Sequence, residues 1–273
     1  MTTSSDHSEI TESLSQQWEA LARLTDGLTE DRWRTPSPLP GWTVFDVLAH
    51  VIGTESLLLG EPTPDTDTDV HALPHVHNAI GALNEKWVES LRPLSGTALR
   101  ERFREVTDRR RTALAQLTAD DWQAPSESPI GTVPYARFMD IRLFDCWMHE
   151  LDIADALATA ATESGPRAER AFAELVPTLP RAVAKQAQAP DGSRITIALT
   201  GPIARQLHIA VDGRGELVEA LDGPATVTIT MSSGRFARLR GGRTTAAAHR
   251  GEITVAGDTA LGERISDHFA FTI

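Results

Sequence analysis

The sequence predicts an α+β protein of two domains: a helical bundle over residues 1–160 and a small α+β domain over residues 190–273, joined by a helical connection over residues 161–189. Apolar residues recur at helical spacing up to about residue 189, and after Pro190 they alternate with polar residues as they do in strands. A length of 273 residues also exceeds what one compact core usually needs.

Helices are predicted in the first domain wherever apolar residues return every three or four positions. In the first of these helices, Leu14, Trp18, Leu21 and Leu28 lie on or near one face. The predicted helices cover residues 10–28, 43–59, 77–91, 96–117 and 134–157. The polar or proline-rich segments between them, among them residues 60–69 and 124–134, are predicted loops.

Local signals predict where some of these helices begin. Thr43 followed by Asp46 forms a capping-box pattern at the start of the second helix. Pro93 separates the third predicted helix from the fourth, for which Ser95 is a candidate N-cap.

The second half of the chain predicts a short helical stretch and then mostly strands. Residues 166–188 have a helical pattern that Pro177 and Pro180 should interrupt, because proline lacks the backbone donor. Strands rich in Val, Ile and Thr are predicted over residues 193–201, 204–213, 215–221 and 225–232. A short basic helix over 233–243, a strand over 252–258 and a helix over 259–269 complete the domain.

Composition excludes several classes of protein. Asp and Glu outnumber Lys and Arg by 38 to 26, and a net charge of -12 repels the phosphate backbone of nucleic acid. The single cysteine cannot form an internal disulfide, and the N-terminal residues show no signal-peptide pattern. Without an apolar run long enough to cross a bilayer, a cytoplasmic location is expected and no membrane partner.

The candidate functional residues lie in the stretch FDCWMHELD, residues 144–152. Asp145 and His149 are four residues apart and therefore share one face of a helix. His50 stands in an apolar stretch of the second helix, and facing helices of a bundle can bring such residues together. Two histidines and one carboxylate would leave an open position on zinc or another divalent ion, as catalytic sites do.

A simpler interpretation of the same residues stays open. A single histidine on an apolar helix face is usually a hydrogen-bonded core residue. The spacing of Asp145 and His149 also suits an ordinary hydrogen bond between their side chains.

Three segments resemble one family. Residues 39–55 (LPGWTVFDVLAHVIGTE) and 142–157 (RLFDCWMHELDIADAL) resemble the mycothiol-dependent maleylpyruvate isomerase family, and residues 232–265 resemble its second domain more loosely. The resemblance implies a DinB-like four-helix bundle followed by a sterol-carrier-like α+β domain. Its zinc ligands would correspond to His50, Asp145 and His149, with aspartate in place of the family's glutamate. Aspartate shortens the reach of that ligand by one methylene.

The resemblance also implies a chemistry. A divalent metal, zinc or alternatively nickel, iron or manganese, would activate a low-molecular-weight thiol such as mycothiol as a thiolate. In an isomerase the thiolate adds to a double bond of a small electrophile such as maleylpyruvate, allows rotation and leaves; in an S-transferase it attacks and stays. Arg243, and next Arg238, would pair with the carboxylates of an acidic substrate. Ordinary surface arginines are the alternative.

Other residues near the predicted ligands have their own predicted roles. Asp152 and Arg142 share the ligand face, and Trp42 is a candidate wall, so these three are candidates for holding the cofactor. Asp152 could orient an imidazole, and Trp42 could equally belong to the core. Cys146 is turned about 100° away along the helix and is expected to be a buried hydrophobe. The histidines at 71, 75 and 77 are expected to be solvent-exposed.

Two other functions compete with the enzyme. One is a small-molecule binding or carrier protein with a structural or vestigial metal site, and the other is a regulatory protein with a metal-sensing bundle. The enzyme should lose activity but not its fold when His50 becomes Ala, whereas a carrier needs no exchangeable metal. The expected partners are the electrophile and the thiol, and the expected state is a monomer or a homodimer.

Overall fold

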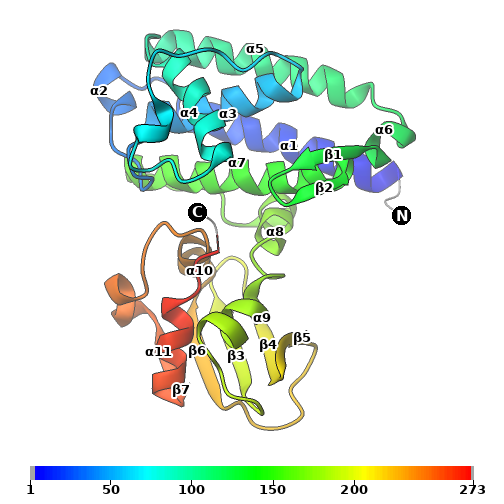
Figure 1. Ribbon diagram of the computed structural model, residues 1–273, viewed down its shortest axis with the longest axis vertical. Coiled ribbons are helices and arrows are strands. Elements are labelled where there is room, and N and C mark those ends of the chain that lie inside the picture. The colour runs from blue at the N-terminus through cyan, green and yellow to red at the C-terminus, as the bar shows by residue number, and fades with distance from the viewer. Residues whose placement is uncertain (1–3, 272–273) are drawn as a thin grey trace. The chain divides into compact units, whose positions relative to one another are not determined.

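The computed structural model describes residues 4–271, which form two compact units that meet in the chain between Thr162 and Glu163 (Figure 1). The first unit is mainly helical, and the second combines one sheet with short helices. The predicted α+β class with two domains is therefore confirmed. The segment 163–189, part of the predicted helical connection, belongs to the second unit.

Four long helices form the bundle of the first unit: α1 (Ser4–Leu24), α3 (Val44–Leu58), α5 (Gly96–Ala115) and α7 (Tyr135–Leu157). Helix α1 packs on α5 and α7, and α3 packs on the same two helices, so the four enclose one core. A fifth helix, α4 (Ala79–Leu91), packs on the outer side of α3 (Figure 1). The core includes Leu14, Trp18 and Leu21, as the helical spacing predicts.

The capping signals act as predicted. The Asp46 backbone N–H donates to Oγ1 of Thr43, and Oδ2 of Asp46 accepts from the Thr43 backbone N–H at 2.8 Å. Ser95 caps α5 by accepting from the backbone N–H of Ala98 at 3.2 Å. The capping box thus fixes the start of α3, which carries His50 seven residues later.

Several boundaries differ from the predictions. The first helix ends at Leu24 rather than Leu28, because the chain turns at Gly27 with a φ of 65° before the short helix α2 (Glu30–Trp33). The predicted loop 124–134 contains an antiparallel hairpin, β1 (Pro125–Ser128) and β2 (Gly131–Pro134). Two more short helices were not predicted, η1 (Val70–Ala72) and α6 (Ala119–Gln123).

The second unit contains one five-stranded sheet in the order β5-β4-β3-β6-β7. Its strands are β3 (Arg194–Thr200), β4 (Arg205–Asp212), β5 (Arg214–Val218), β6 (Val227–Ser232) and β7 (Thr254–Gly257). Only the pair β3 and β6 is parallel, and the other pairs are antiparallel. Alternate residues of β6 are buried, as are Ile195, Ile197 and Leu199 of β3, which accounts for the two-residue period of the sequence.

Short helices complete this unit: α8 (Gly165–Ala173), α9 (Leu179–Arg181), the π-helical turn η2 (Ala182–Gln186), α10 (Ser233–Arg240), η3 (Ala247–Glu252) and α11 (Thr259–Asp267). The predicted interruption occurs at 174–178, around Pro177. Pro180 instead lies in the first turn of α9, where a missing backbone N–H leaves no hydrogen bond unmade.

Candidate metal centre

Two helices of the first unit bring three predicted ligands together. Helix α3 presents His50, and α7 presents Asp145 and His149 one turn apart. One ligand atom from each of these residues lies within 4.8 Å of the others. Both imidazoles are buried, whereas the Asp145 side chain is 34% exposed. The cluster therefore has an open side at the carboxylate.

The spacing of the donor atoms fits a divalent ion. Nε2 of His50 lies 3.4 Å from Oδ2 of Asp145, and Nε2 of His149 lies 3.5 Å from Oδ1. These separations are longer than the usual 2.7–3.2 Å, roughly, of an N–H···O hydrogen bond. Ligands about 2.0–2.1 Å from a tetrahedral zinc would lie roughly 3.3–3.4 Å apart. The three side chains thus form a candidate metal site with donors suited to zinc.

His149 is oriented by a second carboxylate. Its Nδ1 lies 2.9 Å from Oδ2 of Asp152, which is fully buried one turn further along α7. Because an ionised carboxylate accepts, Nδ1 carries a proton, and Nε2, which faces Asp145, is the ring nitrogen that could bind a metal once it is deprotonated. Asp152 thus acts on the orientation of His149 from behind the ring.

Buried charges hold Asp145 from the other side. Arg142 donates from Nη1 to Oδ2 of Asp145 and from Nη2 to Oε1 of Glu55 at 2.8 Å. Glu55 also accepts from Nε of Arg110 at 2.8 Å, and Arg110 donates to the hydroxyl of Tyr135 at 3.1 Å. Glu55, Arg110 and Arg142 are all buried, so two guanidinium groups share the Glu55 carboxylate, and one of them also binds Asp145.

These surroundings separate the protonation behaviour of the three ligands. Burial lowers the pKa of His50, although Asp145 opposes that effect. Burial would also lower the pKa of His149, but the carboxylates of Asp145 and Asp152 outweigh it and raise that pKa. Burial would raise the pKa of Asp145, yet His149 and Arg142 hold it well below its usual range. Asp145 is therefore an ionised carboxylate near neutral pH.

Trp42 forms an aromatic wall beside the two imidazoles. Its ring centroid lies 5.3 Å from that of His50 and 6.5 Å from that of His149. The two imidazoles lie 4.8 Å apart, nearly edge to face. The half-buried Trp42 side chain is thus part of the same cluster.

The predicted arginines lie in the second unit. Arg238, on α10, donates to Oε1 of Glu163 at 2.9 Å and to the backbone carbonyl of Gly234 at 3.1 Å. Arg243 follows the helix and donates to the carbonyl of Gly241 at 2.6 Å. Both side chains belong to a unit separate from the one that holds the histidines.

Cys146 is buried, as expected. Its sulfur accepts from Nη2 of Arg142 at 3.2 Å, and burial raises the pKa of the thiol. It therefore lacks the thiolate character of a nucleophile or a ligand.

Sequence reasoning missed the buried acids around the site. Glu55 stands five residues after His50, and Glu85 stands in the stretch ALNEKWVES, where acids are usually solvated. A signal for Glu55 was present, because the residue lies amid the mostly apolar residues of α3. The expectation for the loop histidines needs a correction at one position, since the His75 side chain is only 18% exposed and faces Glu85.

The fold and the site together define a two-unit protein with a candidate His-His-carboxylate metal centre in a helical bundle. Residues 14–154 match the mycothiol maleylpyruvate isomerase N-terminal domain, and residues 170–264 match the C-terminal domain of the same family. The chain belongs to the mycothiol maleylpyruvate isomerase family.

Individual relatives are more distant. Two uncharacterized proteins of Mycobacterium tuberculosis, from strains CDC 1551 and H37Rv, are each 29% identical over 142 residues, which is 50% of this chain and 52% of theirs. The chain thus spans about half the length of the curated relatives it matches.

Similar solved structures support the fold. A crystal structure of the mycothiol-dependent maleylpyruvate isomerase gives a TM-score of 0.58 at 20% identity, covering 94% of this chain and 96% of that one. A mutant of that isomerase gives 0.57 at 21% identity with the same coverage. Among residues 4–271, no helix is long and apolar enough to cross a membrane.

Proposed function

We propose that the chain is a metal-dependent enzyme that uses a low-molecular-weight thiol, mycothiol, as an activated thiolate. The observation that carries the proposal is the convergence of His50, Asp145 and His149 within 4.8 Å in a chain of this family. A divalent ion held there would lower the pKa of a coordinated thiol, so that the thiolate is available near neutral pH.

The residues of the chain have distinct tasks in this proposal. His50, Asp145 and His149 hold the ion, which we propose to be zinc, with nickel, iron or manganese as alternatives. Asp152 fixes the tautomer of His149, and Arg142 fixes the carboxylate of Asp145. Trp42 supplies an apolar surface beside the imidazoles, against which a thiol or its partner can pack.

The substrate is proposed to be a small electrophile such as maleylpyruvate. In thiol-assisted isomerisation, the sulfur would add to a carbon–carbon double bond, permit rotation and be expelled as the double bond re-forms. In S-transfer, the same sulfur would displace or add to an electrophile and remain. Arg243 and then Arg238 are our candidates for pairing with substrate carboxylates, because a planar guanidinium binds a carboxylate through two hydrogen bonds.

Elemental analysis of the purified protein tests the metal. The parent should hold about one ion per chain, and His50→Ala should lose it while its circular dichroism stays unchanged. His71→Ala is the control, because His71 is exposed and is not one of the three clustered ligands. A parent that takes up no zinc, nickel, cobalt, iron or manganese even on reconstitution would refute the proposal and favour a carrier.

A second measurement tests the thiol. Cobalt-substituted protein should develop a near-ultraviolet sulfur-to-cobalt absorption band when mycothiol is added, and the band should be absent from His50→Ala. Assays with maleylpyruvate and with simple alkylating electrophiles then separate isomerase from transferase activity. A cobalt-loaded parent without that band would refute coordination of the thiol.

A further inference from the structure

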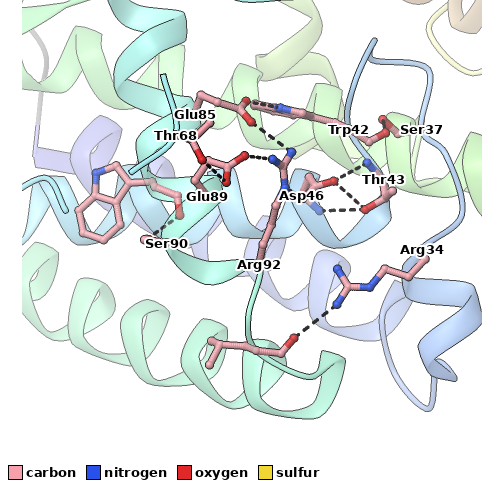
Figure 2. Close-up of polar contacts among 12 residues, drawn as sticks. Arg34, Ser37, Trp42, Thr43, Asp46, Thr68, Glu85, Glu89, Ser90 and Arg92 are labelled. Atoms are coloured by element: carbon pink, nitrogen blue, oxygen red, sulfur yellow. Dashed lines mark hydrogen bonds and ion pairs between the residues drawn. The ribbon is translucent and has the colours of Figure 1, made fainter. Parts of the chain in front are cut away.

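A second polar cluster lies beside the candidate metal centre, at the start of α3 and along α4 (Figure 2). At its centre Arg92 pairs with Asp46 at 2.9 Å through Nε, with Glu85 at 3.1 Å through Nη2, and with Glu89 through Nη1. Figure 2 shows the indole nitrogen of Trp42 directed at the Glu85 carboxylate, which also faces Arg92.

Glu85 is the most deeply buried member of this cluster, with a side chain that is 0% exposed. Its Oε2 accepts from Nε1 of Trp42 at 2.7 Å and lies 3.0 Å from Nε2 of His75, while Oε1 faces Arg92. A buried carboxylate is costly unless its oxygens are paired. Here Oε2 accepts the hydrogen bond from Trp42, whereas Oε1 has the ion pair with Arg92 but no hydrogen bond among the described residues. The three contacts come from different segments of the chain.

His75 is pressed against the residue that precedes Trp42. Gly41 has a φ of 80°, and a Cβ atom there would lie 2.5 Å from Nδ1 of His75. Only a residue without a side chain allows this approach at that φ. His75 therefore contacts both Gly41 and Glu85, and Glu85 also accepts from the Trp42 indole.

The cluster contains more contacts than the attachment of α4 to α3 requires. The pair between Arg92 and Asp46 already joins the end of α4 to the first turn of α3. Besides its pair with Arg92, Glu85 contacts Trp42 and His75, and neither of these two residues belongs to a helix. The Trp42 ring in turn lies beside the imidazoles of His50 and His149, with centroids 5.3 Å and 6.5 Å away.

We propose that Glu85 is a positioning residue, which holds the Trp42 indole as a fixed wall of the thiol subsite beside His50 and His149. The role of Glu85 at the thiol subsite rests on the proposed function, whereas its effect on the placement of Trp42 can be measured without metal. His75 contacts the same oxygen of Glu85, Oε2, as Trp42 does, so the segment before α4 is held beside Trp42.

The test compares two matched substitutions on α4. Glu85→Met removes the acceptor for Trp42 and keeps the side-chain volume. Glu89→Met is the control, because Glu89 lies on the same helix and contacts the same Arg92, but its other partner is Thr68 rather than Trp42. Glu85→Gln keeps an oxygen that can accept the indole N–H and serves as the conservative rescue. Each variant is also made with Trp42→Phe, so that the emission of Trp42 is obtained by difference.

The first readout uses metal-free protein. In Glu85→Met the Trp42 emission should shift to longer wavelength and be quenched more strongly by acrylamide, whereas Glu89→Met should match the parent and Glu85→Gln should lie close to it. Unchanged Trp42 emission in Glu85→Met would overturn the proposed placement.

The second readout uses cobalt-loaded protein and mycothiol. Glu85→Met should keep one ion per chain but need about tenfold more mycothiol for half-saturation of the sulfur-to-cobalt band, as for other residues that orient a site. Trp42→Phe, which removes the indole N–H that donates to Glu85, should give a similar shift, and the double variant should add little. Equal half-saturation in the parent and in both variants would overturn the role at the thiol subsite. A parent that binds no cobalt would instead refute the proposed function, while the metal-free readout still decides the placement.

Discussion

The imidazole of His149 lies between two carboxylates, with Nδ1 2.9 Å from Asp152 and Nε2 3.5 Å from Asp145. Asp152 is fully buried and orients the ring, whereas Asp145 is partly exposed and belongs with His149 to the candidate metal site. The contact between Asp152 and His149 therefore predicts that a change at Asp152 alters the metal affinity.

Asp152→Asn should weaken zinc binding by about 10- to 100-fold, because the amide is a poorer acceptor for Nδ1–H and no longer fixes the tautomer. Competition with a chromogenic chelator measures the affinity. Asp155→Asn, at an exposed position three residues further along α7, should leave the affinity unchanged. Equal affinities for the two variants would show that Asp152 does not support the ligand.

Metal affinity should fall as the pH is lowered, starting above the ordinary histidine pKa of about 6.5. Only the neutral imidazole binds a metal, and Asp145 and Asp152 raise the pKa of His149 in the metal-free protein despite its burial. Zinc must therefore displace a proton from His149 at pH values where an ordinary imidazole is already neutral. Calorimetry in buffers of different ionisation enthalpy counts the released protons, and no release near pH 7 would contradict this explanation.

Glu55→Gln should lower the free energy of unfolding by about 3–5 kcal/mol, because it leaves the buried guanidinium groups of Arg110 and Arg142 without their shared carboxylate. Glu101→Gln, on the exposed face of α5, should change it by less than about 0.5 kcal/mol. Urea denaturation followed by circular dichroism gives both values.

The same carboxylate predicts a pH dependence of stability. Burial would raise the pKa of Glu55, but Arg142 and Arg110 outweigh it and lower that pKa in the folded protein. A lowered folded-state pKa means that the stabilisation is complete above the unfolded pKa and is lost as the pH falls through the folded one. Glu55→Gln should therefore flatten the acid limb of the stability curve, and an unchanged limb would contradict the assignment.

Gly41→Ala should destabilise the protein more than Gly27→Ala. Both positions have a positive φ, so each change carries a backbone cost of about 1–2 kcal/mol. The Cβ at position 27 meets nothing within 4 Å, whereas the Cβ at position 41 meets the His75 ring at 2.5 Å. The difference between the two unfolding free energies measures the contact with His75, and equal values would show that His75 moves aside freely.

Arg243→Gln should raise the KM for a dicarboxylate substrate on the order of tenfold while leaving the metal content intact, if its guanidinium pairs with the substrate. Arg214→Gln, at an exposed position of β5, is the control. Equal KM values would move the assignment to Arg238, which already pairs with Glu163.

The helical spacing predicted that Asp145 and His149 lie on one face, and the family resemblance added His50 to them. Asp145 and His149 share a face because they are four residues apart, and the capping box at Thr43 fixes where the helix of His50 begins. The hairpin over 125–134 was missed because its strands are short, largely exposed and bounded by prolines. The two strands lack the alternation of apolar and polar residues by which a strand can be predicted from sequence.

Glu55 and Glu85 show what a single sequence hides. Both are acids on helices, where the usual expectation is a solvated face. Glu55 pairs with arginines from distant segments, and Glu85 accepts from Trp42, 43 residues away, besides pairing with the nearby Arg92. Arg110 is 55 residues beyond Glu55 in the chain, so no local pattern links the two. The roles of Asp152 and Arg142 around the proposed ligands likewise depend on distances that spacing alone does not give.

The burial of Cys146 has a practical consequence. The chain holds one cysteine, and its thiol is enclosed and has a raised pKa, so reagents that consume free thiols should barely touch the folded protein. Colorimetric thiol counting in an assay mixture would then report the added cosubstrate alone. Labelling of Cys146 by a maleimide, followed over time, would in turn record how often the bundle opens, and would do so without any engineered probe.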